Sequence, residues 1–278
     1  MLNLGDEAAW QYCYDLLIGL FDKIGVDCYR QDFNWEPLED WRRNDTPDRR
    51  GITEIKHIMG LYRLWDALLE RYPDLLIDNC ASGGRRMDIE MLRRSICLWR
   101  SDYQVYDNFR AEGAQSQNIG FQTWLPYSGT CPGRNCDTYR FRSAYSASLV
   151  VHTPFEDMSD DLVWLKGMLE EYLKVRPYMT EDFYPLTEVT ECQDTWCAVQ
   201  FNRPEENDGV VQVFRREKAP YSVADFALFG LDSAANYVFT DADTGEELVI
   251  SGQTLLTEGI TINLPKKYSC KLYFYNKK

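Results

Sequence analysis

The sequence is poor in histidine and has no long apolar run. Its 278 residues include only two histidines, His57 and His152. Nowhere do about 18 apolar residues follow one another, so no membrane-spanning helix is predicted. Basic residues are also few: 30 Lys and Arg face 44 Asp and Glu, for a net charge of −14. Because nucleic-acid phosphates would be repelled, nucleic-acid binding is not expected.

Motifs of several enzyme classes are absent as well. The sequence contains no glycine-rich phosphate loop, no serine nucleophile elbow and no HExxH zinc motif. No cofactor and no metal are therefore expected. Aromatic residues, by contrast, are abundant: 8 Trp and 18 Tyr fit a substantial core and the ring platforms that sugar sites use.

The nine cysteines are an odd number, so they cannot all pair within one chain. Most lie in apolar runs, where a reduced thiol behaves as a small hydrophobic residue. Cys131 and Cys136, in GTCPGRNC, leave open a loop disulfide or part of a metal site, but neither histidine lies near them in sequence. This usage favours a reducing, cytoplasmic compartment.

Helical and extended patterns alternate over the first part of the chain. Strands are expected at 27–33, 75–80, 95–100, 122–125 and 148–152. Long helices are expected at 6–24, 53–72 and 159–178. This alternation favours a parallel sheet or barrel. From Phe183 onward, short apolar runs separated by Asp-Gly, Pro and Asn predict an antiparallel β-sandwich. We therefore expect two domains, 1–182 and 183–278.

Charged residues follow two of the expected strands. Arg30 and Asp32 lie two residues apart, so they share one face of their strand, and a guanidinium favours the ionised form of a neighbouring carboxylate. An ionised Asp at the carboxyl end of a barrel strand suits a nucleophile or base. Asp102 ends a second Arg-x-Asp pattern after the strand at 95–100. Two carboxylates converging at one rim are what a glycosidase requires.

Three segments, taken in order, resemble a known family. YRQDFN (29–34), NCASGGRRMD (79–88) and LWRSD (98–102) look like the catalytic half of glycoside hydrolase family 36, the retaining α-galactosidases. That family has a Lys-Trp-Asp-Met-Asn-like strand end, a Cys-Ser-Gly-Gly-Gly-Gly-Arg-Phe-Asp-like corner and a Trp-Thr-Ser-Asp-like strand end. The C-terminal segment FALFGLDSAANYVFTDADTGEEL (226–248) resembles the family's terminal β domain.

The resemblance assigns chemical roles to the two carboxylates. It implies that Asp32 is the nucleophile, which forms a glycosyl-enzyme, and that Asp102 is the acid/base of a double displacement with net retention. Arg30 stands where the family has Lys and would offer a cation to sugar hydroxyls.

The same resemblance implies further substrate contacts. Cys80 and Ser82 match positions on the 2-hydroxyl side of the sugar, and Trp99 is a candidate wall of the sugar pocket. Asn34 joins this substrate-binding set, although a supporting role in the scaffold is more typical of its position. Because Ala81-Ser82 replaces Ser-Gly, the preference for galactose over N-acetylgalactosamine is left open.

Two arginines in the same corner have a separate interpretation. Arg85 and Arg86 either bind sugar or pair with acidic neighbours, and we favour pairing with Asp88 and Glu90. In that interpretation both guanidinium groups support the corner between the strand at 75–80 and the next helix rather than contacting substrate.

The implied fold class is α/β: a partial (β/α)8 TIM barrel, strands four to eight, followed by a C-terminal antiparallel β-sandwich. A closed barrel needs eight strands, and five are expected here. The chain would then lack strands one to three, with the family's pair of Asp residues that grip the galactose 4- and 6-hydroxyls. We expect an open half-barrel with exposed apolar edges, poor stability alone and little turnover.

The function implied is an exo-acting retaining α-galactosidase that removes terminal α-linked galactose from oligosaccharides. An α-N-acetylgalactosaminidase of the same family is one alternative. A non-catalytic fragment or a carbohydrate-binding module is another. The expected ligands are α-galactoside oligosaccharides, and a homo-oligomer is left open.

Overall fold

The computed structural model describes residues 1–106, 108–133, 136–151 and 162–278. They form two compact units, Met1–Ser101 and Asp102–Lys278. Within the described residues, no helix combines the length and the apolar character needed to cross a membrane.

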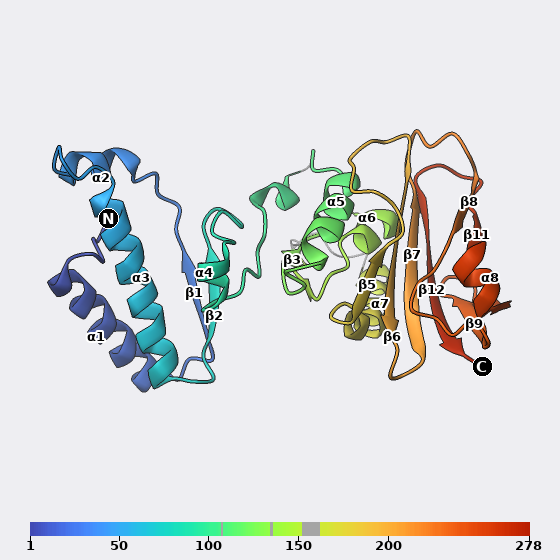
Figure 1. Cartoon of the computed structure of the whole chain (residues 1–278), viewed down its shortest axis with the longest axis horizontal. Helices are drawn as coiled ribbons and strands as arrows, with labels where there is room; N and C mark the ends of the chain where they lie inside the picture. The colour runs from blue at the N-terminus through green and yellow to red at the C-terminus, as the bar shows by residue number, and fades with distance from the viewer. Residues whose placement is uncertain (107, 134–135, 152–161) are drawn as a thin grey trace. The chain divides into compact units, whose positions relative to one another are not determined.

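The first unit packs two long helices against a short parallel pair of strands (Figure 1). Its elements are α1 (Glu7–Ile24), β1 (Cys28–Asp32), α2 (Leu38–Asn44), α3 (Ile52–Arg71), β2 (Leu76–Cys80) and α4 (Ile89–Leu92). Helix α1 begins where the sequence predicts, because Asp6 accepts a hydrogen bond from the Ala9 N–H at 3.0 Å as its N-cap.

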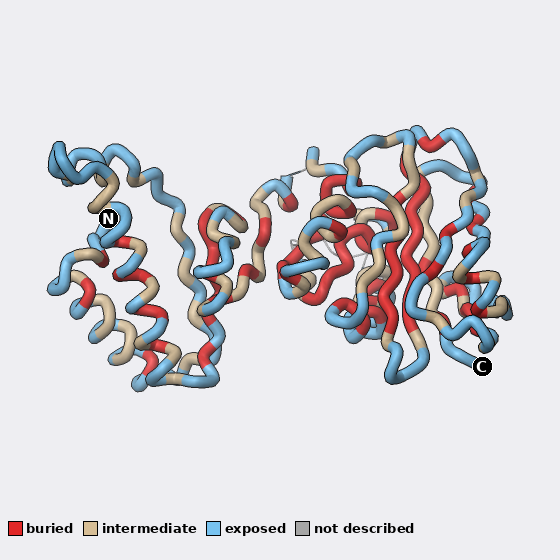
Figure 2. The backbone as a smooth tube through the Cα atoms, viewed as in Figure 1, coloured by how far each residue is buried: buried red, intermediate tan, exposed pale blue. Residues whose placement is uncertain are grey.

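The core of the first unit lies between the helices and one face of the strands. Its buried members include Trp10, Phe21, Leu61, Leu64, Trp65, Leu68 and Ile77. Strand β1 is less buried than β2, since its residues alternate between exposed and half-buried (Figure 2). The exposed polar face of β1 therefore points away from this core.

The strands expected after β2 differ from the structure. The segment 95–100 forms no full strand; only Ile96 bridges to Asp78, in parallel. The cause is that the Leu98 N–H donates to the Asp78 carboxylate at 3.1 Å rather than to a backbone carbonyl. The prediction of a strand at 122–125 is wrong, because the Leu125 N–H still donates to the Phe121 carbonyl in a helical turn.

The second unit begins with short helices and ends in a large sheet. Its helical elements are η1 (Asp102–Val105), α5 (Ala111–Gln122), α6 (Thr138–Ser143), α7 (Leu162–Val175), η3 (Arg176–Tyr178) and α8 (Gly252–Thr257). Its strands are β3 (Gly129–Thr130), β4 (Ser148–Leu149), β5 (Asp182–Pro185), β6 (Trp196–Arg203), β7 (Asp208–Arg215), β8 (Val223–Phe226), β9 (Asn236–Asp241), β10 (Glu247–Ser251), β11 (Ile260–Asn263) and β12 (Ser269–Lys277). The expected strand at 148–152 is reduced to β4, and His152 and Ser159 lie outside the described residues.

The six-stranded sheet has the order β10-β9-β12-β7-β6-β5 and is antiparallel throughout. Helices α5, α6 and α7 cover one face, and the antiparallel pair β8–β11 covers the other (Figure 1). Alternate residues of β6 show this division, since Val199 joins the helical core while Ala198 joins the core under β8 and β11. The predicted antiparallel sheet in the C-terminal part is confirmed.

The barrel strands are not confirmed. Parallel pairing among the described residues is limited to β1–β2, the two-residue pair β3–β4 and isolated bridges. The predicted boundary between 182 and 183 stays a prediction. Helices α5–α7 share a core with the C-terminal sheet, and the compact units divide instead between Ser101 and Asp102.

Candidate functional site

Four polar side chains lie together on one face of β1 and β2. The two strands run parallel with Arg30 opposite Asp78 and Asp32 opposite Cys80. Residues two apart in a strand point to the same face, so all of these side chains share one environment. The opposite face of β1 is occupied by Gln31, which accepts a hydrogen bond from the Trp65 indole at 2.7 Å.

Arg30 binds Asp78 more closely than Asp32. Its NH1 group donates to Asp78 Oδ2 at 2.5 Å, whereas its NH2 group lies 3.8 Å from Asp32 Oδ2. Burial opposes the charge on Arg30, but the hydrogen bond and charge of Asp78 outweigh it and raise the Arg30 pKa. The expected ion pair with Asp32 is present but is the weaker of the two.

Cys80 supplies a thiol beside Asp32. The residue is 1% exposed, and burial is the main cause that raises its pKa, with the negative charge of Asp32 acting in the same direction. The thiol therefore stays protonated at neutral pH. Cys80 was expected near Asp32, and the strand register brings the two residues together.

Asn34 and Ser82 form a second polar contact just beyond the strand ends. The Ser82 N–H and Oγ–H both donate to Asn34 Oδ1, at 2.9 and 2.8 Å. Ser82 has a φ of 49°, in the left-handed region that favours glycine, so these hydrogen bonds help to hold a strained backbone. In this structure Asn34 supports the corner that carries Ser82.

The two arginines of the corner do not pair as expected. Arg85 contacts Glu36 at 3.1 Å and Ser82 Oγ at 3.1 Å, while Arg86 donates to the carbonyl of Cys80 at 2.7 Å. The prediction of pairing with Asp88 and Glu90 is wrong. Asp88 is the N-cap of α4, and the carboxylate of Glu90 binds two other arginines, Arg93 and Arg94.

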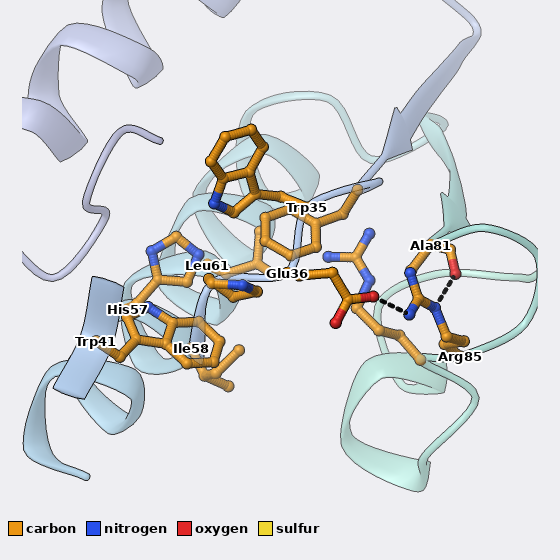
Figure 3. Close-up of a pocket in the computed structure, with 11 residues that line it drawn as sticks. Trp35, Glu36, Trp41, His57, Ile58, Leu61, Ala81 and Arg85 are labelled. Carbon is orange, nitrogen blue, oxygen red and sulfur yellow. Dashed lines mark hydrogen bonds and ion pairs between the residues drawn. The ribbon is translucent and has the colours of Figure 1, made fainter. Parts of the chain in front are cut away.

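A cavity of about 260 Å³ lies beside this corner (Figure 3). Its walls are mainly aromatic and aliphatic, with the Arg85–Glu36 ion pair on one side. The lining residues are Phe33, Trp35, Glu36, Pro37, Trp41, His57, Ile58, Leu61, Ala81, Arg85 and Arg86. Phe33 directly follows Asp32 and, by strand alternation, points to the opposite face, so Asp32 is not part of this cavity.

The remaining predicted site residues lie further along the chain. Trp99 is half-buried, and its carbonyl accepts a hydrogen bond from the Cys97 thiol at 3.2 Å. Asp102 is half-buried at the start of η1 and belongs to the second unit. The predicted convergence of Asp32 and Asp102 stays a prediction, as does the sugar contact of Trp99.

Asp78 is the residue that sequence reasoning missed. It is 4% exposed and sits in the middle of LLIDNC, a run that predicts a buried strand. A charged residue in such a strand needs a partner, and its position two residues before Cys80 places it on the same face. These two signals are in the sequence, but the partner depends on strand register, which is not.

Comparisons with known proteins bear on this site. The family model described as Melibiase matches residues 1–111, which include Asp32, Cys80 and Asp102. An α-galactosidase of Pediococcus pentosaceus is 24% identical over 99% of this chain and 38% of its own length. An α-galactosidase of Escherichia coli is 33% identical over 37% of this chain and 14% of its own length. The chain thus spans less than two fifths of the length of these relatives.

Solved structures give the same fold. The GH36 α-galactosidase AgaA of Geobacillus stearothermophilus, as a variant in complex with raffinose, aligns with a TM-score of 0.81 and 20% identity over 99% of this chain and 39% of its own. The α-galactosidase of Lactobacillus brevis aligns with a TM-score of 0.81 and 18% identity over the same shares of the two chains. The strand-end motifs and these matches agree, and the chain is related to the α-galactosidases of glycoside hydrolase family 36.

Proposed function

We propose that this chain carries the nucleophile and the acid/base of a retaining α-galactosidase that removes terminal α-linked galactose from oligosaccharides. The observation that supports the proposal best is the cluster of four polar side chains at the ends of β1 and β2, formed by Arg30, Asp32, Asp78 and Cys80. There Asp32 is 38% exposed on its side chain, lies beside a protonated thiol and is within 3.8 Å of a guanidinium. A carboxylate that is ordered yet accessible suits attack on a sugar carbon.

The proposed reaction has two steps. An Asp32 oxygen attacks the anomeric carbon as the glycosidic C–O bond breaks, and Asp102 gives its proton to the leaving oxygen. Asp102 then takes a proton from water, whose oxygen attacks the same carbon and releases Asp32 as a carboxylate. Two inversions leave the product with the α configuration of the substrate.

The fold proposal accompanies the reaction. We infer that residues 1–182 form strands four to eight of a (β/α)8 barrel and that 183–278 form a β-sandwich domain. The parallel register of β1 and β2, with polar residues at their carboxyl ends, supports this inference. Because the chain matches only 38% of the length of a relative, the activity of this chain alone is also a proposal.

Hydrolysis of p-nitrophenyl α-galactoside by the purified chain tests the proposal. We expect slow turnover by the chain alone, and this turnover should fall roughly 10³-fold or more in Asp32→Asn and in Asp102→Asn, since each variant removes a group from the reacting unit. Asp66→Asn is the matched control, because it removes an exposed carboxylate of the same unit that binds Arg94. Proton NMR of the first-formed sugar should show α-galactose.

The other outcomes distinguish the alternatives. A first-formed β-anomer would replace retention by inversion. Faster turnover of the N-acetylgalactosaminide would favour the α-N-acetylgalactosaminidase. Galactoside binding without turnover would favour a carbohydrate-binding module. Neither binding nor turnover would leave a non-catalytic fragment.

A further inference from the structure

Asp78 is a buried carboxylate with both of its oxygens occupied. Oδ2 accepts from Arg30 at 2.5 Å, and Oδ1 accepts from the Leu98 N–H at 3.1 Å. Only 6% of its side chain is exposed. Because an unpaired charge in a protein interior is strongly destabilising, Asp78 and Arg30 constrain each other.

Arg30, by contrast, is not fixed by packing. Its side chain is 42% exposed, so its position depends on the carboxylates around it. Two carboxylates are within reach, and the contact with Asp78 is more than 1 Å shorter than the contact with Asp32. As a result, Asp32 is not closed into a bidentate pair with the guanidinium.

The neighbouring thiols do not compete for Arg30 at neutral pH. Burial is the main cause that raises the pKa values of the Cys28, Cys80 and Cys97 thiols, so each of them stays neutral. Arg86 is a second cation whose charge acts on Asp32, and its hydrogen bonds go to backbone carbonyls. Asp78 is therefore the charge that sets the position of Arg30.

We propose that Asp78 is a positioning residue for the reaction: it holds one edge of the Arg30 guanidinium and thereby keeps the carboxylate of Asp32 open for attack on the sugar. The inference rests on the proposed function and goes beyond it by assigning a role to a residue that is only 4% exposed. Its physical basis is that the cation of Arg30 has two carboxylate partners, of which Asp78 is buried and Asp32 is exposed.

The direct test follows the Arg30 side chain by NMR. The exchange rate of its Nη1–H protons with water reports how often the hydrogen bond to Asp78 Oδ2 opens, and Arg30→Lys identifies the signal by removing it. We expect Asp78→Asn to raise this rate about tenfold or more, since a charged hydrogen bond contributes about 1.5–3 kcal/mol. Asp32→Asn should leave the rate within about twofold, the scale of a weak exposed ion pair.

The reciprocal variant keeps the test decisive if Asp78→Asn does not fold. Because Asp32 is 38% exposed on its side chain, its replacement should not prevent folding. A tenfold faster exchange in Asp32→Asn would overturn the proposal by showing that Asp32 holds Arg30. Unchanged exchange in a folded Asp78→Asn would also overturn it. Asp66→Asn, which frees Arg94 from a 2.6 Å contact, is the control that should not affect Arg30.

A kinetic measurement connects the position of Arg30 to the reaction. In Asp78→Asn, Arg30 can close on Asp32, and this pair must open before attack. We therefore expect kcat to fall about tenfold with a much smaller change in KM. An unchanged kcat would contradict the positioning role. A wild-type chain without turnover would count against the proposed function alone, because the exchange measurement would still decide whether Asp78 positions Arg30.

Discussion

Asp32 and Cys80 stand opposite each other in the parallel register of β1 and β2, so the thiol and the carboxylate share one face of the strand pair. This pairing joins a 38%-exposed acid to a residue that is only 1% exposed. One side of the carboxylate thus faces a buried group while the other side remains accessible. This arrangement fits the proposed role of Asp32 as the nucleophile.

Replacing Cys80 by alanine should therefore impair turnover more than replacing it by serine. We predict that Cys80→Ala lowers kcat/KM about tenfold, because the donor group that faces the Asp32 carboxylate is lost. Cys80→Ser keeps a donor at the same place and should retain most of the activity. Equal losses in the two variants, measured with p-nitrophenyl α-galactoside, would show that a hydrogen-bond donor at this position has no role.

Ser82 should limit the space on the 2-hydroxyl side of the sugar. Its hydroxyl is held between Asn34 and Arg85, so it cannot easily turn away from a larger substituent. We predict that galactosides are better substrates than N-acetylgalactosaminides. Ser82→Gly should raise the relative kcat/KM for the N-acetyl sugar about tenfold, the scale of a small steric change in a pocket. A ratio that does not change would remove Ser82 from the specificity argument.

Arg142 joins α6 to α7 and to the turn between β9 and β10. It is 3% exposed and binds the carboxylates of Glu171 and Asp243. We predict that Arg142→Ala lowers the free energy of unfolding of the second unit by about 1.5–3 kcal/mol, because the largely buried carboxylate of Glu171 loses a charged hydrogen-bond partner. Denaturant unfolding measures the effect. Lys166→Ala, which breaks an exposed pair with Glu170, should leave the midpoint unchanged.

Cys197 should make stability depend on pH on the alkaline side. Burial raises the pKa of its thiol from 9.0 to about 11. The folded chain keeps this proton to a higher pH than the unfolded chain, so the contribution is complete below pH 9 and is lost as pH rises toward about 11.

The corresponding measurement is the unfolding midpoint as a function of pH. Cys197→Ala should reduce its fall between pH 9 and about 11, whereas Cys192→Ala, at an exposed cysteine, should not. Identical slopes in the two variants would contradict the assignment.

The cysteines stay separate from one another, since no disulfide forms among the described residues, which include all nine cysteines. The disulfide considered for Cys131 and Cys136 is therefore absent.

The long helices were predictable because their signals are local. Asp6 caps α1, and apolar residues at helical spacing form the buried side of α3. The resemblance also placed Asp32 and Cys80 in one site, and strand register explains why they meet.

What could not be predicted depends on contacts distant in sequence. The segment at 95–100 has the composition of a strand, but the carboxylate of Asp78 takes the Leu98 N–H that a continued ladder would use. Arg85 lies three residues before Asp88, yet Asp88 is occupied as a helix cap and Glu36 is the partner instead. In both cases a side chain from another segment decides the outcome.

The most direct test of the central claim is to trap the sugar on Asp32. An α-galactosyl fluoride with a second fluorine at C5 reacts in the first step, because fluoride leaves readily, and then hydrolyses slowly. Mass spectrometry of the digested chain should find one hexosyl adduct on the peptide that contains Asp32, and none in Asp32→Asn. An adduct on another carboxylate, or none in a chain that hydrolyses galactosides, would contradict the account.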